Sequence, residues 1–213
     1  MFKINSMTPH EIHLGQTIIR YQCPVDIVKE INEVYDKNFN SLMDNNKNSA
    51  GKIKEEKSLY SAKKDEKHNF LSKETLRFFE NCFQDYLFKV GHVLHQRKIS
   101  SIWVNEMKRN EYNPMHFHMS PDTFYGLSSV LFLKVPNDYG PEYSKPDNPN
   151  NGRLEFMGNG GGQFSINQLK VDGREGQFYV FPFDLKHGVY PFNADVTRRT
   201  LSVNCDVYKE LTI

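Results

Sequence analysis

Apolar residues in the first half of the chain recur at the spacing of helix turns. Between Pro24 and about Met43 they fall at three- and four-residue intervals, at Ile27, Val28, Ile31, Val34, Tyr35 and Leu42. A second run starts after Ser72, a residue type that favours helix N-caps, and continues to about His95. Its apolar positions are Leu76, Phe79, Phe83, Tyr86, Leu87, Val90 and Leu94. The pattern predicts two amphipathic helices, each with one buried stripe that needs a surface to pack against.

The second half of the chain alternates between short strand-like runs and turn residues. The runs are 101–109, 127–135, 153–157, 177–183 and 199–208. They are rich in β-branched and aromatic residues, as strands are. Long connections separate them, including an Asn- and Pro-rich segment at 136–152. Short strands with long loops predict an antiparallel sandwich or barrel, with the helices packed on one outer face.

The chain has 213 residues, which is enough for one domain with a sizeable core. We therefore expect a single domain over residues 1–213, with a helix-rich support in residues 1–100 and a β-rich core in residues 101–213. Residues 44–67 carry many charges and few large apolar side chains. This composition predicts an exposed connection or a frayed helix, without a chemical role.

Composition limits the partners and the cellular location that we expect for the protein. A hydrophobic share of 38% with 25% charged residues is that of a folded protein. The formal net charge of +1 argues against nucleic acid or an anionic membrane as a partner. The three cysteines are far apart and odd in number, and they lack CxxC spacing, which suggests neither a disulfide framework nor a thiolate zinc site. With no basic and apolar leader at the start of the sequence, we expect a cytoplasmic protein that does not enter membranes.

Histidines carry the strongest chemical signal. His116 and His118 follow a strand and a turn at Asn113-Pro114, and in an extended segment they project from the same face. His187 follows another strand-like run. Three neutral imidazoles that meet at the mouth of a barrel are a common ligand set for a redox-active or hydrolytic divalent metal. The alternative is that all three are surface or hydrogen-bonded core histidines.

The order of motifs after residue 100 adds to the histidine pattern. These motifs are Trp103-Val104-Asn105, the HxH of His116 and His118, Ser128-Ser129-Val130, Gly152 with Leu154 and Phe156, Gly176 with Phe181 and Pro182, then His187, and Arg198 with Thr200, Ser202 and Asn204. In this order they resemble the iron(II)/2-oxoglutarate-dependent oxygenases, specifically the small bacterial and viral group related to prolyl hydroxylases. The resemblance covers residues 103–204. It implies a mainly β fold with some α: a double-stranded β-helix, or jelly roll, with N-terminal helices packed on one face and iron held at one open end.

The resemblance also implies a ligand set for the iron. His116 corresponds to the proximal histidine and His187 to the distal one. Most of the superfamily has Asp or Glu two residues after the proximal histidine, whereas this chain has His118. The implied set is therefore three histidines, with Asp122 or Glu155 as the alternative source of a carboxylate. Three imidazoles leave an extra positive charge on the metal, which favours an anionic cosubstrate.

A cation for the distal carboxylate of 2-oxoglutarate is implied on the strand after the distal histidine, with a hydroxyl residue two positions on. Arg198 and Thr200 match this pattern, and Arg199 replaces Arg198 if the register differs by one. Arg is expected rather than Lys because a guanidinium binds a carboxylate through two hydrogen bonds. The tyrosine pair that the family has on the strand after the HxH is replaced here by Leu131-Phe132, so that strand lacks a tyrosine hydroxyl. Candidates to replace its hydroxyl are Asn105, Tyr125 and Tyr179.

The activity implied by the resemblance is that of a hydroxylase with iron(II) as cofactor and 2-oxoglutarate as cosubstrate. Such an enzyme couples decarboxylation of 2-oxoglutarate to succinate with O2-dependent oxidation of a second substrate, here a small molecule or a protein or peptide. One alternative is a cupin-like three-histidine dioxygenase or isomerase that does not use 2-oxoglutarate. Another is a non-catalytic jelly-roll binding or virion module. The sequence does not identify the substrate. It also leaves open whether the protein forms a homodimer through an exposed helix face.

Overall fold

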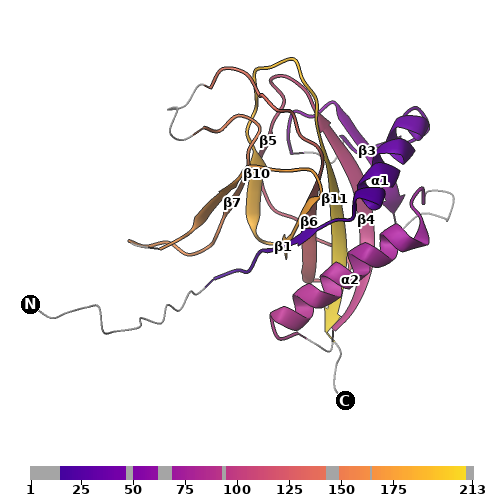
Figure 1. Cartoon of the computed structure of the whole chain (residues 1–213). Helices are drawn as coiled ribbons and strands as arrows, with labels where there is room; N and C mark the ends of the chain where they lie inside the picture. The colour runs from indigo at the N-terminus through magenta and orange to yellow at the C-terminus, as the bar shows by residue number, and fades with distance from the viewer. Residues whose placement is uncertain are drawn as a thin grey trace, which may run out of the picture.

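Two antiparallel sheets form the body of the protein (Figure 1). The computed structural model describes residues 15–46, 50–61, 69–92, 95–142, 149–163 and 165–209. Within these ranges a seven-stranded sheet has the order β1-β9-β6-β11-β4-β3-β2, and a four-stranded sheet has the order β5-β10-β7-β8. The arrangement confirms the predicted jelly roll with few helices.

Most strands lie in the part of the chain that the sequence pattern assigns to the β-rich core. The large sheet consists of β1 (Ile19–Gln22), β2 (Met43–Asp44), β3 (Glu55–Ser61), β4 (His95–Met107), β6 (Tyr125–Lys134), β9 (Gln177–Pro182) and β11 (Arg198–Lys209). The small sheet consists of β5 (Asn113–His116), β7 (Leu154–Met157), β8 (Gln168–Val171) and β10 (Lys186–Val189).

Both predicted helices are present, and both cover the same face of the large sheet (Figure 1). They are α1 (Val25–Asn38) and α2 (Lys73–Lys89), each shorter at its C-terminal end than the apolar spacing suggests. Ser72 is the N-cap of α2, because its hydroxyl accepts a hydrogen bond from the Thr75 backbone N–H at 3.1 Å. Ile31, Phe79 and Phe83 are fully buried in the core between this layer and the sheet.

The prediction for residues 44–67 was wrong over the part that the structure describes. Residues 55–61 form β3, which pairs with β4 inside the large sheet, and only residues 62–68 and 47–49 lie outside the described residues. Glu56 and Leu59 of this strand are buried. The other five residues of β3 are partly buried, so its charged side chains lie in the sheet without being fully exposed. The first hundred residues therefore contribute strands as well as helices, and the assignment of residues 1–213 to a single domain stays a prediction.

A second core fills the space between the large and small sheets. Its buried side chains include Phe132 of β6, Phe156 of β7 and Phe181 of β9. Phe181 also packs against the ring of His187, with a centroid distance of 4.7 Å. Strand β10 is thereby fixed against the core at the position of the distal histidine. No helix within the described ranges is long and apolar enough to span a membrane.

Arg199 joins the helical layer to the large sheet. Its Nε donates to Glu106 Oε2 at 2.6 Å, its Nη1 to Asn32 Oδ1 at 2.9 Å and its Nη2 to Asp36 Oδ1 at 2.7 Å. The guanidinium also lies over the ring of Tyr35, 4.3 Å from its centroid. Both Asn32 and Asp36 belong to α1, so this one side chain ties α1 to the start of β11.

We expect Arg199→Met to lower the free energy of unfolding by about 3 kcal/mol, because Glu106 would remain buried without its cation. Glu106 is only 9% exposed. Denaturant unfolding would measure the change. Lys29→Met is the matched control, since it breaks the solvent-exposed Lys29–Glu33 pair at 3.8 Å and should leave stability unchanged. Equal losses in the two variants would contradict a special role for Arg199.

Candidate active site

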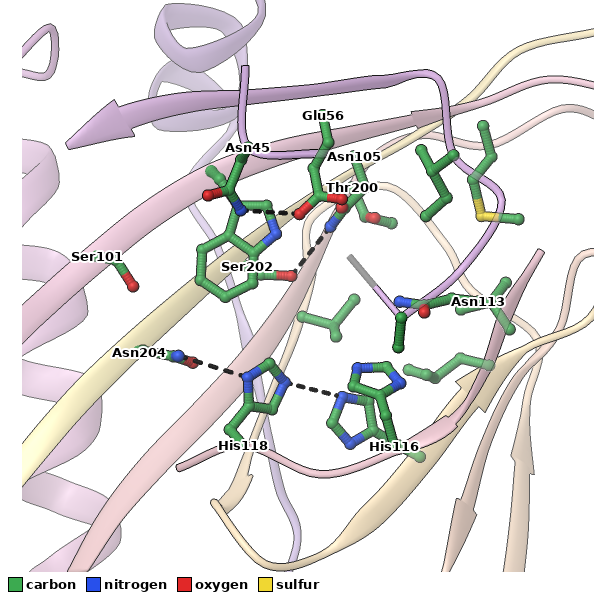
Figure 2. A pocket seen from close by; sticks show the side chains of 18 of the residues that line it. Asn45, Glu56, Ser101, Asn105, Asn113, His116, His118, Thr200, Ser202 and Asn204 are labelled. Atoms are coloured by element: carbon green, nitrogen blue, oxygen red, sulfur yellow. Dashed lines mark hydrogen bonds between the residues drawn. The ribbon is translucent and has the colours of Figure 1, made fainter. Parts of the chain in front are cut away.

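A cavity of about 400 Å³ lies between the two sheets and contains most of the residues that the sequence singled out (Figure 2). Strands β3, β4 and β11 supply a largely polar wall. Strands β5 and β10, with the residues just after β5, supply three histidines. The predicted site residues that line the cavity are Asn105, His116, His118, His187, Arg198 and Thr200.

The three histidines converge as their spacing predicts. His116 and His187 are directly opposite each other in the pairing of β5 with β10. His118 comes two residues after His116 on the same side, and its backbone N–H donates to the Phe183 carbonyl at 2.8 Å. The ligand atoms of the three imidazoles all lie within 4.8 Å of one another. Topology therefore brings residues separated by about seventy positions of sequence to one point.

Backbone carbonyls orient two of these rings. His116 Nδ1 lies 2.7 Å from the Pro114 oxygen, and His187 Nδ1 lies 3.0 Å from the Leu185 oxygen. Because a carbonyl only accepts, Nδ1 carries the proton in both rings, and Nε2 is left with a lone pair. A metal-binding histidine usually has such a partner on its other nitrogen, which fixes the tautomer and the ring orientation.

Burial keeps the imidazoles neutral. It lowers the pKa of all three histidines, that of His187 to about 3 and that of His118 well below its usual range. The neighbouring imidazole of His116 lowers the pKa of His187 further, because two positive rings at this distance would repel each other. Neutral imidazole is the form that binds a metal.

The spacing of the rings fits a divalent cation. His118 Nε2 and His187 Nε2 are 3.2 Å apart. Two nitrogens bound at about 2.1 Å in neighbouring coordination positions would be separated by about 3 Å. The donor set, its orientation and its separation therefore all suit a metal held by His116, His118 and His187.

Neither alternative carboxylate joins this group in the described part of the chain. Glu155 is buried away from the cavity, where its Oε2 accepts a hydrogen bond from the Tyr190 hydroxyl at 2.6 Å and its Oε1 accepts one from Gln168. Asp122 is exposed and does not line the cavity. The set of three histidines is the one that the geometry favours.

Arg198 is a buried cation that faces the same cavity. Its side chain is 1% exposed, and its guanidinium lies 5.1 Å from the centroid of Phe132. Its polar neighbours are the Met107 thioether, 3.8 Å from Nη1, and the Tyr139 phenol. Nε and Nη2 have no hydrogen-bond partner among the described residues. Burial lowers its pKa, yet a guanidinium stays protonated at neutral pH.

A buried guanidinium that has no acidic partner among the described residues calls for an anion. Burying an unpaired charge is costly, and a carboxylate matches the forked N–H donors of Arg. The unsatisfied atoms of Arg198 therefore fit one carboxylate of a dicarboxylic acid. Arg199 differs, because Glu106 and Asp36 already occupy its guanidinium on the opposite face of β11.

Two more of the predicted residues lie on the polar wall. Thr200 and Asn105 are opposite each other in the pairing of β11 with β4, and both are buried. The Asn105 amide donates to Ser202 Oγ at 3.1 Å. Neither Tyr125 nor Tyr179 lines the cavity, so of the three candidates for the missing tyrosine hydroxyl only Asn105 does.

Several lining residues were not predicted from the sequence, and Glu56 is the clearest case. Its carboxylate Oε1 accepts a hydrogen bond from the Asn45 amide at 2.8 Å, and both residues face the cavity (Figure 2). They lie in the segment 44–67, whose charge suggested a solvated connection. The sequence of β3 has no apolar alternation that could have revealed this strand. Trp103, 5.9 Å from the His118 ring, was noted only as part of a motif.

Gly188 determines how closely β5 approaches β10. A Cβ at this position would lie 3.0 Å from the Asn113 oxygen and 3.1 Å from the Met115 nitrogen, both in β5. We expect Gly188→Ala to destabilise the protein by about 1–3 kcal/mol through overpacking and to weaken metal binding, because the strand that carries His116 must shift. Thermal unfolding and metal titration would measure both effects. Gly161→Ala, where a Cβ meets nothing within 4 Å, should change neither.

Comparison with known proteins agrees with this geometry. Residues 101–204 match the model of a family described as "Putative 2OG-Fe(II) oxygenase". The match spans the three histidines and the polar wall of β11. No curated protein matches the sequence.

Solved structures share the fold at low sequence identity. The viral collagen prolyl hydroxylase of Paramecium bursaria Chlorella virus-1, solved with 2-oxoglutarate, is 10% identical with a TM-score of 0.53, over 90% of this chain and 96% of that one. A prolyl-4-hydroxylase from Pseudomonas putida is 12% identical with a TM-score of 0.53, over 92% and 93% of the two chains. A Trichoplax adhaerens prolyl hydroxylase, solved with a hypoxia-inducible-factor peptide, is 14% identical with a TM-score of 0.53, over 91% and 83%.

The family match over residues 101–204 and the histidine cluster indicate an enzyme of the 2-oxoglutarate-dependent oxygenase class. Residues 101–204, which include all three histidines and Arg198, are the part of the chain that is similar to this family, and the activity that this part supports is that of a 2OG-Fe(II) oxidoreductase. Fe(II) is accordingly its cofactor and 2-oxoglutarate its cosubstrate.

Proposed function

We propose that the protein is a hydroxylase that couples decarboxylation of 2-oxoglutarate to succinate with O2-dependent oxidation of a carbon in a second substrate. One observation carries this proposal. A single cavity combines three neutral, converging histidines with a buried guanidinium that has free donors in the described structure. A three-histidine enzyme without 2-oxoglutarate would have no use for the buried cation.

Each side chain has a distinct part in this proposal. His116, His118 and His187 hold the iron, and Arg198 pairs with the distal carboxylate of 2-oxoglutarate, with Thr200 and Asn105 as additional polar contacts along the cosubstrate. When bound, iron and 2-oxoglutarate together supply the oxidising chemistry of the class.

The rest of the cavity excludes water and orients the cosubstrate. Val130, Leu154 and Val189 form apolar parts of its lining. A dry cavity strengthens the attraction between the guanidinium and a carboxylate, because the effective dielectric constant is lower than in water. The positions of the polar groups are set by strands, which hold them more rigidly than loops would.

Exposed apolar side chains at the mouth of the cavity support a substrate that projects beyond it. Phe117 is 50% exposed and Met119 is 79% exposed, and both line the cavity. We propose that the oxidised carbon enters the cavity while an apolar flank of the substrate, in a peptide or protein or in a small molecule, contacts these two residues. We also propose a reducing, cytoplasmic setting, supported by three buried cysteines that are all free. Homodimer formation stays a prediction.

An anaerobic titration tests the proposed function. Fe(II) would be added to the apoprotein with and without 2-oxoglutarate, followed by absorption in the visible range. We expect a charge-transfer band that needs both components, and succinate after O2 is admitted with substrate. Iron binding without any change on adding 2-oxoglutarate would favour the cosubstrate-free alternative, and no iron binding would refute the assignment of the histidines.

A further inference from the structure

Asn204 contacts the one histidine of the cluster that lacks a backbone carbonyl partner in the described structure. The Asn204 side-chain amide nitrogen lies 3.4 Å from His118 Nδ1 (Figure 2). On its other side, Asn204 Oδ1 accepts a hydrogen bond from the Ser128 hydroxyl at 2.9 Å, and Ser128 is 1% exposed. The amide is thus held between a buried hydroxyl on β6 and an imidazole of the metal site.

Hydrogen bonds link Ser128, Asn204, His118, His187 and the Leu185 carbonyl in series. The carbonyl at the end of this series sets the direction of each bond. The Leu185 oxygen can only accept, so His187 carries its proton on Nδ1 and its Nε2 must accept. His118 Nε2, at 3.2 Å, therefore donates to His187 Nε2. A neutral His118 then has a lone pair on Nδ1, which accepts from the Asn204 amide N–H. Without a metal, each donor in the series from Ser128 to Leu185 therefore faces an acceptor.

Metal binding requires the opposite arrangement at His118. A metal needs the Nε2 lone pairs of all three rings, so the proton of His118 must be on Nδ1. Nδ1–H then needs an acceptor, and the Asn204 carboxamide can offer its oxygen after a turn of the amide. Its NH2 group would then donate to the Ser128 oxygen, which accepts as readily as it donates.

We propose that Asn204, held by Ser128, is a positioning residue that sets the tautomer of His118 and so determines whether this ring presents a lone pair or an N–H to the metal. The inference rests on the proposed function for its use of the metal. An amide is suited to this role because it can donate or accept at the same place, whereas a carboxylate only accepts. Metal entry therefore replaces the hydrogen bond between His118 and His187.

The tautomer of His118 can be measured without any metal. In the metal-free protein, ring-nitrogen chemical shifts of isotope-labelled histidine should place the His118 proton on Nε2. Asn204→Asp, whose carboxylate accepts only, should move it to Nδ1. Ser101→Asp is the control for charge, because Ser101 is opposite Asn204 in the pairing of β11 with β4 and lines the same cavity. This control should leave the tautomer unchanged.

Metal affinity gives the second measurement, with Co²⁺ alone as the probe. Asn204→Leu, which removes both hydrogen bonds at similar volume, should weaken Co²⁺ binding by about 10–100-fold, as loss of a hydrogen-bond partner to a ligand usually does. Asn204→Asp should bind Co²⁺ at least as tightly as the wild type. Unchanged affinity in Asn204→Leu, or a His118 proton that stays on Nε2 in Asn204→Asp, would overturn the proposal.

The two proposals fail in different ways. If the wild type binds no metal, the proposed function is refuted, while the shift of the His118 proton in Asn204→Asp still decides the role of Asn204. If metal and 2-oxoglutarate bind as expected but neither the His118 tautomer nor the Co²⁺ affinity changes in the Asn204 variants, only the positioning role is refuted. Ser128→Ala tests the same proposal if the Asn204 variants misfold. It leaves Asn204 in place but should weaken the preference of the His118 proton for Nε2.

Discussion

Replacement of Arg198 by methionine is expected to weaken 2-oxoglutarate binding strongly and to raise the thermal stability of the cosubstrate-free protein. The affinity should fall because the distal carboxylate would enter a buried cavity without its cation. Truncating one partner of a buried charge pair costs about 2–5 kcal/mol, or about 30-fold to several thousand-fold in affinity. Stability should rise because the buried guanidinium has unsatisfied donors, and a thioether suits the neighbouring Met107 and Phe132 better.

Opposite effects on binding and stability make this prediction specific. The dissociation constant would come from the anaerobic absorption titration, and stability from thermal unfolding without cosubstrate. Arg199→Met is the matched control on the same strand, because it should lose stability and keep its affinity for 2-oxoglutarate. If Arg198→Met retains wild-type affinity, or if Arg199→Met loses it, Arg198 is not the cosubstrate anchor.

Replacement of His118 by alanine is expected to eliminate tight iron binding, and with it turnover. His118 supplies one of three converging nitrogens, and its Nε2 lies 3.2 Å from that of His187. Two imidazoles alone, without the carboxylate that completes the usual set of the superfamily, would leave the cation weakly held. Equilibrium titration with Fe(II) under anaerobic conditions would give the loss in affinity.

Two further variants separate the possible ligand sets. Glu155→Gln and Asp122→Asn remove the carboxylates that the sequence left open as ligands. Both should bind iron as the wild type does, since Glu155 is bonded to Tyr190 away from the cavity and Asp122 is exposed. Iron binding that survives in His118→Ala but is lost in either carboxylate variant would replace His118 in the ligand set.

The metal-binding part of the site could be predicted from sequence because it depends on local geometry. Two histidines at alternate positions of an extended segment must share a face, and a histidine after another strand can meet them. The choice between Arg198 and Arg199 could not be made in this way. Adjacent residues of a strand point to opposite faces, and both faces of β11 are buried here. Only the contacts with Glu106 and Asp36 show which arginine is already satisfied.

Strand β3 was missed for a different reason. Its charged residues are supported by contacts that lie far away in sequence, such as the ion pair between Glu55 and Lys108 at 2.6 Å. Glu56 faces a cavity instead of apolar neighbours, so β3 lacks the apolar alternation by which strands are recognised. In the small sheet, β7 falls within the predicted run 153–157, whereas β5, β8 and β10 have four residues each and lie in no predicted run, because so short a strand shows little periodic pattern.

The buried charge of Arg198 also affects how long the folded protein survives in a cell. A fold that buries a cation without its counter-ion is complete only when the anion arrives, so the cosubstrate acts as part of the core. A ligand that binds only the folded state stabilises it in proportion to the logarithm of its concentration. The amount of this enzyme in a cell would therefore follow the supply of the 2-oxo acid it consumes, because unfolded chains are removed by proteolysis.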